Sequence, residues 1–369
     1  MTPRPSSGLA APPGRSPDQP EPAGPLPSGP PASAPAHRQP VAARVWWLVV
    51  AVLVLGGVMV ASLAFGSRDV AWGDVWAALG GADGTLEQAA ATKRVPRTVL
   101  AVVVGGALGL AGAVMQGVTR NPLGDPGVLG VNMGASLAVV SAVAFFGLTS
   151  PTGYIWVATA GAALSAGFVY AVGTLGRGGA TPLKLALAGA ATSAAFASLV
   201  SVVVLPRNDI AGSFRLWQIG GVGGASFERI GHVLPFLAVG FALCLLSARA
   251  LNSLALGDEL AAGLGERVAV ARAVAALGAV VLCGAATAVA GPIAFVGLVV
   301  PHTCRLLVGV DHRWLLPFSV LLGAALLTVA DVVGRVVARP AEIDVGIVTA
   351  LIGAPFFICI VRRQKVRAL

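Results

Sequence analysis

Long intervals without any charged residue run through most of this chain, and they constrain its fold more than any other feature of the sequence. They recur from residue 44 to residue 362. A transmembrane helix needs about 20 predominantly apolar residues, and a charge at its centre costs about 2.5–3.5 kcal/mol. Only 11% of the 369 residues are charged, too few to cover a water-facing surface of this size. The sequence therefore predicts an all-α polytopic membrane protein.

The intervals predict about ten transmembrane helices. Two intervals are too long for one span and are divided by the turn-forming residues 150–153 and Gly291-Pro292. The expected spans lie between residues 44 and 68, 97 and 120, 125 and 150, 153 and 177, 184 and 207, 229 and 249, 272 and 291, 292 and 307, 313 and 331, and 344 and 362. An even number of spans places both termini on one side. The basic C-terminal segment RRQKVRAL predicts that this side is cytoplasmic.

The chain divides into a tail and a membrane domain. Residues 1–40 hold 13 of the 25 prolines and cannot bury a core. They are predicted to form a disordered cytoplasmic tail. Residues 41–369 are predicted to form the transmembrane domain.

Motifs for nucleotide binding and catalysis are absent from the sequence. No G-x-x-x-x-G-K-[ST] motif can be written around Lys93, Lys184 or Lys365, and no catalytic or metal-binding constellation is present. We therefore expect a transport protein rather than an enzyme, with no cofactor or metal of its own. The net charge of +9 lacks a clustered basic face with interleaved aromatic residues, so no nucleic-acid partner is expected.

Ionisable residues are nearly absent from the expected spans. Carriers coupled to protons or sodium usually place Asp, Glu or His at mid-membrane. The nearest candidates, Asp331 and His302, lie near expected span ends. This pattern favours a pathway powered by another subunit, with an ion-coupled secondary transporter as the alternative.

Two segments carry more specific patterns. In the first, Arg94 and Arg97 flank Pro96 at the outer start of the second span, and four glycines give that span a close-packing face. These glycines are Gly105, Gly106, Gly109 and Gly112. The second segment, residues 251–268, predicts a short amphipathic helix on the cytoplasmic side.

Three leucines recur every four residues along this short helix, at Leu256, Leu260 and Leu264. Asp258 is expected to cap its start and Gly265 to end it. The helix is too short to span a membrane. Periodicity alone leaves two interpretations open, a helix lying along the membrane and a helix docked in a groove of a partner.

Six motifs occur in a fixed order along residues 45–362. They are R-x-P-R, G-A-V-M-Q, N-P-L-x-x-P-x-x-L-G, A-L-G-D-E-L-A-x-x-L-G, G-P-I-x-F-V-G-L-V-x-P-H and G-x-V-T-A-x-I-G-A-P-F-F. In this order they resemble the FecCD-type permeases of bacterial ABC importers, which carry ferric siderophores or cobalamin. The resemblance implies a cobalamin-permease-like fold in the inner membrane, and a permease subunit that translocates a ferric-siderophore complex. Cobalamin and haem are the alternative substrates.

The resemblance also implies partners and roles. A second permease copy or a related permease would complete the path, an ATP-binding subunit would hydrolyse ATP, and an extracytoplasmic substrate-binding protein would dock from outside. Arg94, Arg97 and Arg335 would be docking arginines that face acidic side chains of the binding protein.

Residues 255–265 would form the coupling helix that contacts the ATPase. Its expected coupling residues are Ala255, Leu256, Gly257, Asp258, Glu259, Leu260, Ala261, Leu264 and Gly265. Gln116 lies near the inner end of the second span, and Asn121 and Pro122 lie in the rigid turn that follows. These three residues are expected either to line the path or to pair helices.

Overall fold

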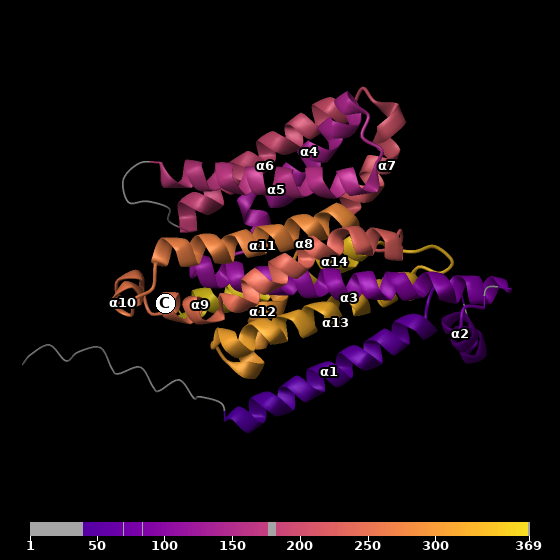
Figure 1. Ribbon diagram of the computed structural model, residues 1–369, viewed down its shortest axis with the longest axis horizontal. Coiled ribbons are helices and arrows are strands. Elements are labelled where there is room, and N and C mark those ends of the chain that lie inside the picture. Colours follow the sequence, from indigo (N-terminus) through magenta and orange to yellow (C-terminus); the bar gives the residue numbers. More distant parts are fainter. Residues whose placement is uncertain (1–39, 69, 83, 176–181, 368–369) are drawn as a thin grey trace, which may run out of the picture. The chain divides into compact units, whose positions relative to one another are not determined.

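The computed structural model describes residues 40–68, 70–82, 84–175 and 182–367. Apart from Pro40, the expected N-terminal tail lies outside the described residues. Within these ranges the structure contains fourteen α-helices, one 3-10 helix and no strand (Figure 1). The expected all-α fold is confirmed.

Each of the ten expected spans has a matching apolar helix. These helices are α1 (Val41–Ala64), α3 (Leu86–Thr119), α4 (Val131–Phe146), α5 (Pro151–Thr174), α6 (Pro182–Val204), α8 (Phe227–Leu246), α11 (Val268–Ala290), α12 (Val296–Val308), α13 (His312–Val337) and α14 (Val345–Arg367). In the part of the chain that the structure describes, seven of them are long and apolar enough to cross a bilayer, whereas α4, α12 and the apolar part of α14 are shorter. The number of ten crossings therefore stays a prediction.

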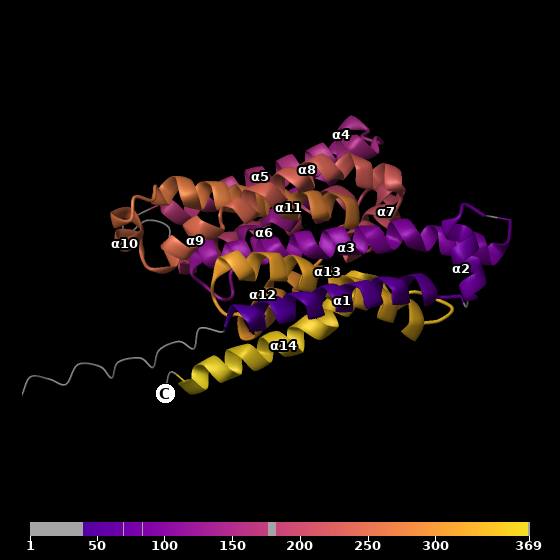
Figure 2. The same ribbon diagram turned by 60° about the horizontal axis from the view of Figure 1, so that its bottom comes forward.

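The remaining helices are short. They are α2 (Trp72–Leu79), η1 (Pro126–Leu129), α7 (Asn208–Ile219), α9 (Ala248–Ala255) and α10 (Asp258–Gly263). Helices α9 and α10 share one end with the start of α1 and the close of α14, which we call the α10 end (Figures 1 and 2). Helices α2 and α7 lie at the opposite end, called the α2 end.

Two helices extend past charges that were expected to mark the ends of their spans. Helix α3 begins at Leu86, so it includes Pro96 and Arg97. Helix α13 continues through Asp331 and ends at Val337. The carboxylate of Asp331 is paired with arginines inside the protein, and a paired charge does not need to reach water.

Two turns that were expected to divide long apolar intervals are confirmed. Helix α5 starts at Pro151, and the Ser150 side chain accepts a hydrogen bond from the Gly153 amide. Helix α11 ends before Gly291, whose φ is 71°. A Cβ at Gly291 would also overlap the carbonyl oxygen of Trp217. Only glycine fits both conditions.

Helix α3 forms the centre of the bundle. Most of its residues are buried, whereas Ser62 is the buried residue of the peripheral helix α1. Helix α3 contacts α1, α2, α8, α9, α11, α12 and α13. Its glycines allow these contacts, because a Cβ at Gly105 would overlap the carbonyl of Gly323 in α13, and one at Gly112 would overlap the backbone of Gly297 in α12. The expected close-packing face is confirmed.

Replacing Gly112 by Ala should destabilise the protein, because an added methyl group has no space against Gly297. Overpacking of this kind typically costs about 1–3 kcal/mol. We expect a lower melting temperature in detergent for Gly112→Ala. The matched control is Gly56→Ala in α1, where an added Cβ has no heavy atom within 4 Å. Equal losses in the two variants would contradict the packing argument.

Candidate functional site

The prediction of a single short helix at residues 255–265 is wrong in its bounds. Two helices occupy this region, and Leu256 and Gly257 separate α9 from α10. Gly257 has a φ of 115°, which glycine adopts easily and other residues rarely do, and the chain turns there. Gly265, with a φ of 88°, follows α10 as expected. We call residues 248–264, which include the residue that caps the end of α10, the α9–α10 segment.

The three leucines of this segment remain on its surface. Leu256, Leu260 and Leu264 are 59%, 62% and 66% exposed. The opposite side is buried in the bundle through Leu251, Leu254 and Ala261. The α9–α10 segment is therefore held by one apolar face and presents a second apolar face outward.

Asp258 does not cap α10, contrary to expectation. The residue before α10 is Gly257, and no side chain caps that helix. Asp258 is instead the first helical residue, and its carboxylate forms ion pairs with Arg120 and Arg272. Arg120 follows the last residue of α3, and Arg272 lies in the first two turns of α11, with 2.8 Å between its Nη2 and Asp258 Oδ1.

A second polar connection joins α9 to the start of α13. The Asn252 side-chain amide donates to Asp311 Oδ1 at 2.7 Å, and its oxygen accepts from the backbone N–H of His312 at 2.9 Å. Asp311 in turn accepts from the amide of Arg313 and so caps α13. Neither Asn252 nor Asp311 was singled out from the sequence, because the two residues are 59 positions apart in the chain.

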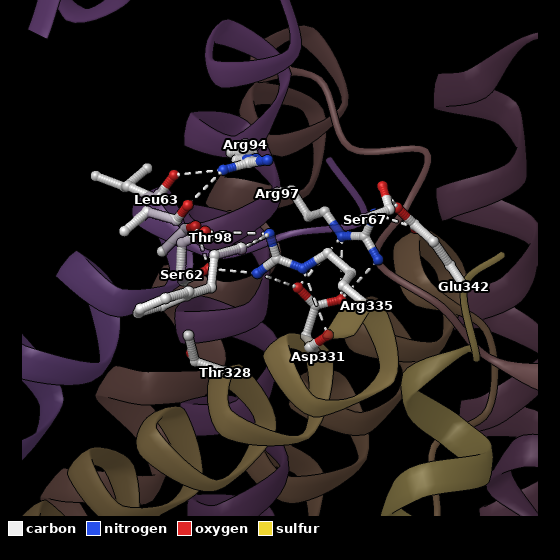
Figure 3. A network of polar contacts seen from close by, with 12 residues as sticks. Ser62, Leu63, Ser67, Arg94, Arg97, Thr98, Thr328, Asp331, Arg335 and Glu342 are labelled. Carbon is white, nitrogen blue, oxygen red and sulfur yellow. Dashed lines mark hydrogen bonds and ion pairs between the residues drawn. The ribbon is translucent and has the colours of Figure 1, made fainter. Parts of the chain in front are cut away.

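Charged residues gather at the α2 end (Figure 3). Arg97 Nε and Nη2 donate to the Asp331 carboxylate at 3.0 and 2.9 Å, and Arg97 Nη1 donates to Glu342 at 2.6 Å. Arg335 Nη2 pairs with Asp331 at 3.0 Å. Asp331 therefore bridges two arginines, and neither acid was singled out as a partner from the sequence.

The arginines expected to dock a binding protein point mainly into the chain. Arg94 is buried and donates to the carbonyls of Leu63, Ala64 and Arg68 at 2.6–2.9 Å. Arg335 is 2% exposed and also donates to Ser62 Oγ at 2.7 Å. Direct contact of these two guanidinium groups with a partner requires these bonds to open. The docking role stays a prediction.

Glu342 is the most accessible member of this charged cluster. It lies in the loop between α13 and α14, and its side chain is 36% exposed, against 13% for Arg97. Its second carboxylate oxygen accepts from Ser67 Oγ at 2.8 Å. Partial burial acts to raise the pKa of the Glu342 carboxyl, but the bonds from Arg97 and Ser67 outweigh it and hold that pKa below its ordinary value.

Gln116 lies where α3 packs against α12. Its side chain is buried, donates to the carbonyl of Gly297 at 3.0 Å and accepts from Arg305 at 2.5 Å. Asn121 Oδ1 accepts from the amide of Leu123, which stabilises the turn after α3, and Pro122 beside it is exposed. In the single chain Gln116 thus pairs helices, and a path-lining role for these residues stays a prediction.

Among the described residues, no group of His, Cys, Asp and Glu side chains is arranged to hold a metal ion. The polar contacts described above are ion pairs and side-chain hydrogen bonds between helices. Such an arrangement can join moving parts, and none of its members is placed as a nucleophile beside a general base.

Comparisons with known proteins agree with this arrangement. Residues 51–363 match the model of the FecCD transport family. The probable siderophore transport system permease YfiZ of Bacillus subtilis is 40% identical over 317 residues, 86% of this chain and 95% of that protein. The ferric enterobactin permease FepD of Escherichia coli is 47% identical over 271 residues, 73% of this chain and 81% of that protein. Permeases named for Fe(3+)-citrate, hemin and cobalamin also match.

A solved structure shares the fold. It is described as a metal-chelate type ABC transporter in an inward-facing conformation, with a TM-score of 0.74 and 29% identity over 86% of this chain and 99% of its own. The resemblance drawn from the six motifs is thereby confirmed. This protein belongs to the FecCD transport family of ABC transporter permeases, multi-pass membrane subunits that work with a separate ATPase.

Proposed function

We propose that this permease forms half of the pathway by which a bacterial ABC importer moves a ferric-siderophore complex across the cytoplasmic membrane. The observation that carries the proposal is the outward apolar face of the α9–α10 segment, made by Leu256, Leu260 and Leu264. An exposed ridge of this kind on a short helix fits a groove in a partner protein. That partner would be the ATP-binding subunit.

The proposed mechanism is alternating access. Closure of two ATPase subunits on ATP would move the α9–α10 segments of two permeases, and the permease pair would open toward one side and then the other. The second permease is a copy of this chain or a relative of it. Iron travels inside its chelator as cargo, so the permease needs no metal ligand. Relatives named for siderophores and ferric enterobactin support this substrate, with hemin and cobalamin as alternatives.

The proposed orientation places the α10 end in the cytoplasm. The described chain begins and ends there, beside the basic segment that follows Val361 (Figure 2). The α2 end then faces outward and would receive the substrate-binding protein. Arg97 is the docking arginine with the least to rearrange, because its outer partner Glu342 lies on an exposed loop. An acidic side chain of the binding protein would replace Glu342 on Arg97.

An ion-coupled carrier is less well supported by the same geometry. Asp331 lies inside the long apolar helix α13, and it is paired with both Arg97 and Arg335. A carboxylate held by two arginines is poorly suited to bind and release protons in a transport cycle.

Uptake should require ATP and both partners. Vesicles that contain this permease, its ATPase and its binding protein should accumulate a ferric siderophore only when ATP is supplied. The measurement is uptake of radioactive iron in the chelate, with hemin and cobalamin compared in parallel. Equal uptake by the permease alone, or uptake driven by an ion gradient without ATP, would refute the proposal.

Replacing Leu256, Leu260 and Leu264 together by Ser should remove the ATPase from the purified complex. Because the three leucines are exposed in the single chain, the variant should keep its melting temperature. Loss of three apolar side chains from a docked face should weaken binding by at least about tenfold. The matched control replaces Leu164, Leu183 and Leu187, which are exposed on α5 and α6, by Ser. The docking proposal fails if both triple variants retain the ATPase equally.

Arg97 and Glu342 should have opposite effects on docking of the binding protein. Arg97→Gln should weaken its affinity about tenfold, because a charge-assisted contact is lost, whereas Glu342→Gln should strengthen it because the internal competitor is removed. Affinity can be measured by biolayer interferometry on permease in nanodiscs. Arg207→Gln, which breaks the exposed pair with Asp209 on the same end, is the control. Weaker binding in Glu342→Gln would show that the glutamate itself contacts the partner.

A further inference from the structure

The α9–α10 segment is tied to the bundle by polar groups at two separate points. The first is Asp258, whose carboxylate joins Arg120 at the end of α3 to Arg272 near the start of α11. Asp258 therefore connects α10 to two helices of the core. Arg120, at the end of α3, is 138 positions before Asp258 in the chain.

The backbone of Arg120 points to a specific need for its side chain. Arg120 ends α3 in the left-handed conformation with a φ of 48°, and its N–H bonds back to Gln116 and Gly117. Glycine and asparagine adopt this conformation most easily, and other residues pay for it. A guanidinium group that must reach Asp258 explains why arginine occupies the position.

The second point is Asn252, whose side-chain oxygen and NH2 group both form hydrogen bonds. Its oxygen accepts from the N–H and from Nδ1 of His312, and its amide group donates to Asp311. Asp311 also faces Arg44 of α1 at 3.9 Å. An aspartate or a leucine at position 252 would leave at least one of these partners without its bond.

We infer that Asp258 and Asn252 are positioning residues that transmit movement of the α9–α10 segment into α3, α11 and α13. In this inference the partner contacts Leu256, Leu260 and Leu264. Asp258 and Asn252 then pass the movement to the bundle through their ion pairs and hydrogen bonds. Helices α3 and α13 then move together, because their backbones touch at Gly105 and Gly323 and no side chain lies between them there that could change its rotamer. The inference rests on the proposed function, since it assumes that a partner moves this segment.

Movement of α3 and α13 would reach the charged cluster at the α2 end. Helices α3 and α13 carry Arg97, Asp331 and Arg335 at the α2 end. A displacement of Asp258 is thus passed along α3 to the residues proposed to meet the binding protein. This gives the two partner-facing ends a continuous physical connection within one chain.

The first experiment uses the permease alone in detergent. Hydrogen–deuterium exchange of the amides of residues 257–265 should become about fivefold faster in Asp258→Asn, because two exposed ion pairs are lost. Asp209→Asn breaks an exposed Arg–Asp pair in α7 and should leave exchange of residues 257–265 unchanged. Unchanged exchange in Asp258→Asn would overturn the inference.

The second experiment uses the complete transporter in proteoliposomes. In Asp258→Asn and in Asn252→Leu, chelate uptake per ATP hydrolysed should fall about fivefold. The charge-exchanged double variant Asp258→Arg with Arg272→Asp restores one ion pair and should recover part of the uptake. Loss of the ATPase in Asp258→Asn would instead make Asp258 a partner contact and overturn the inference.

The two proposals fail in different ways. If the wild-type permease binds no ATPase, the proposed function is wrong, whatever the variants do. If the wild type binds the ATPase and couples uptake to ATP, but Asp258→Asn has the wild-type uptake per ATP, only the inference about Asp258 is wrong.

Discussion

The bilayer interior offers no water to solvate a charge, and the arrangement of this permease depends on that constraint. Asp331 lies inside an apolar helix and is 1% exposed, so it must be paired there. Arg97 from α3 and Arg335 from its own helix supply the pairing, and Arg335 in turn bonds Ser62 of α1. Removing one partner of such a buried pair typically costs about 3–5 kcal/mol. The cluster therefore joins α1, α3 and α13 at the α2 end.

Elsewhere the helices are held together by shape. Lipid is as apolar as a leucine side chain, so apolar area alone gives helices little reason to associate inside a bilayer. Close approach of backbones compensates, and it is made possible by facing glycines such as Gly105 with Gly323 and Gly112 with Gly297. The consequence is a rigid unit of α3, α12 and α13, within which small residues leave little room for adjustment. Movement during transport is then more easily placed between units than within this one.

Charge spacing predicts the helices well, because each gap between charges reports a physical cost that acts locally. It does not predict that α3 and α13 continue past Arg97 and Asp331, since that depends on a pairing between residues 234 positions apart. The same limit applies to Asp258, whose capping role was expected from the neighbouring Gly257, and whose real partners come from α3 and α11. The motifs identified the family, yet they do not reveal that Arg94 and Arg335 bond within their own chain.

Helix α3 connects the contacts at the α2 end to those at the α10 end. Its 34 residues correspond to a length of about 51 Å at 1.5 Å per residue, more than a bilayer core of about 30 Å requires. Arg97 lies about three turns from the start of this helix, on the side of the α2 end, and Arg120 follows its last residue at the other end. Most residues of this helix between Leu100 and Gln116 are buried, so close packing leaves little room for one end to move independently of the other. Displacement of either end must therefore be felt at the other, and partner binding at the two ends should be thermodynamically linked in both directions.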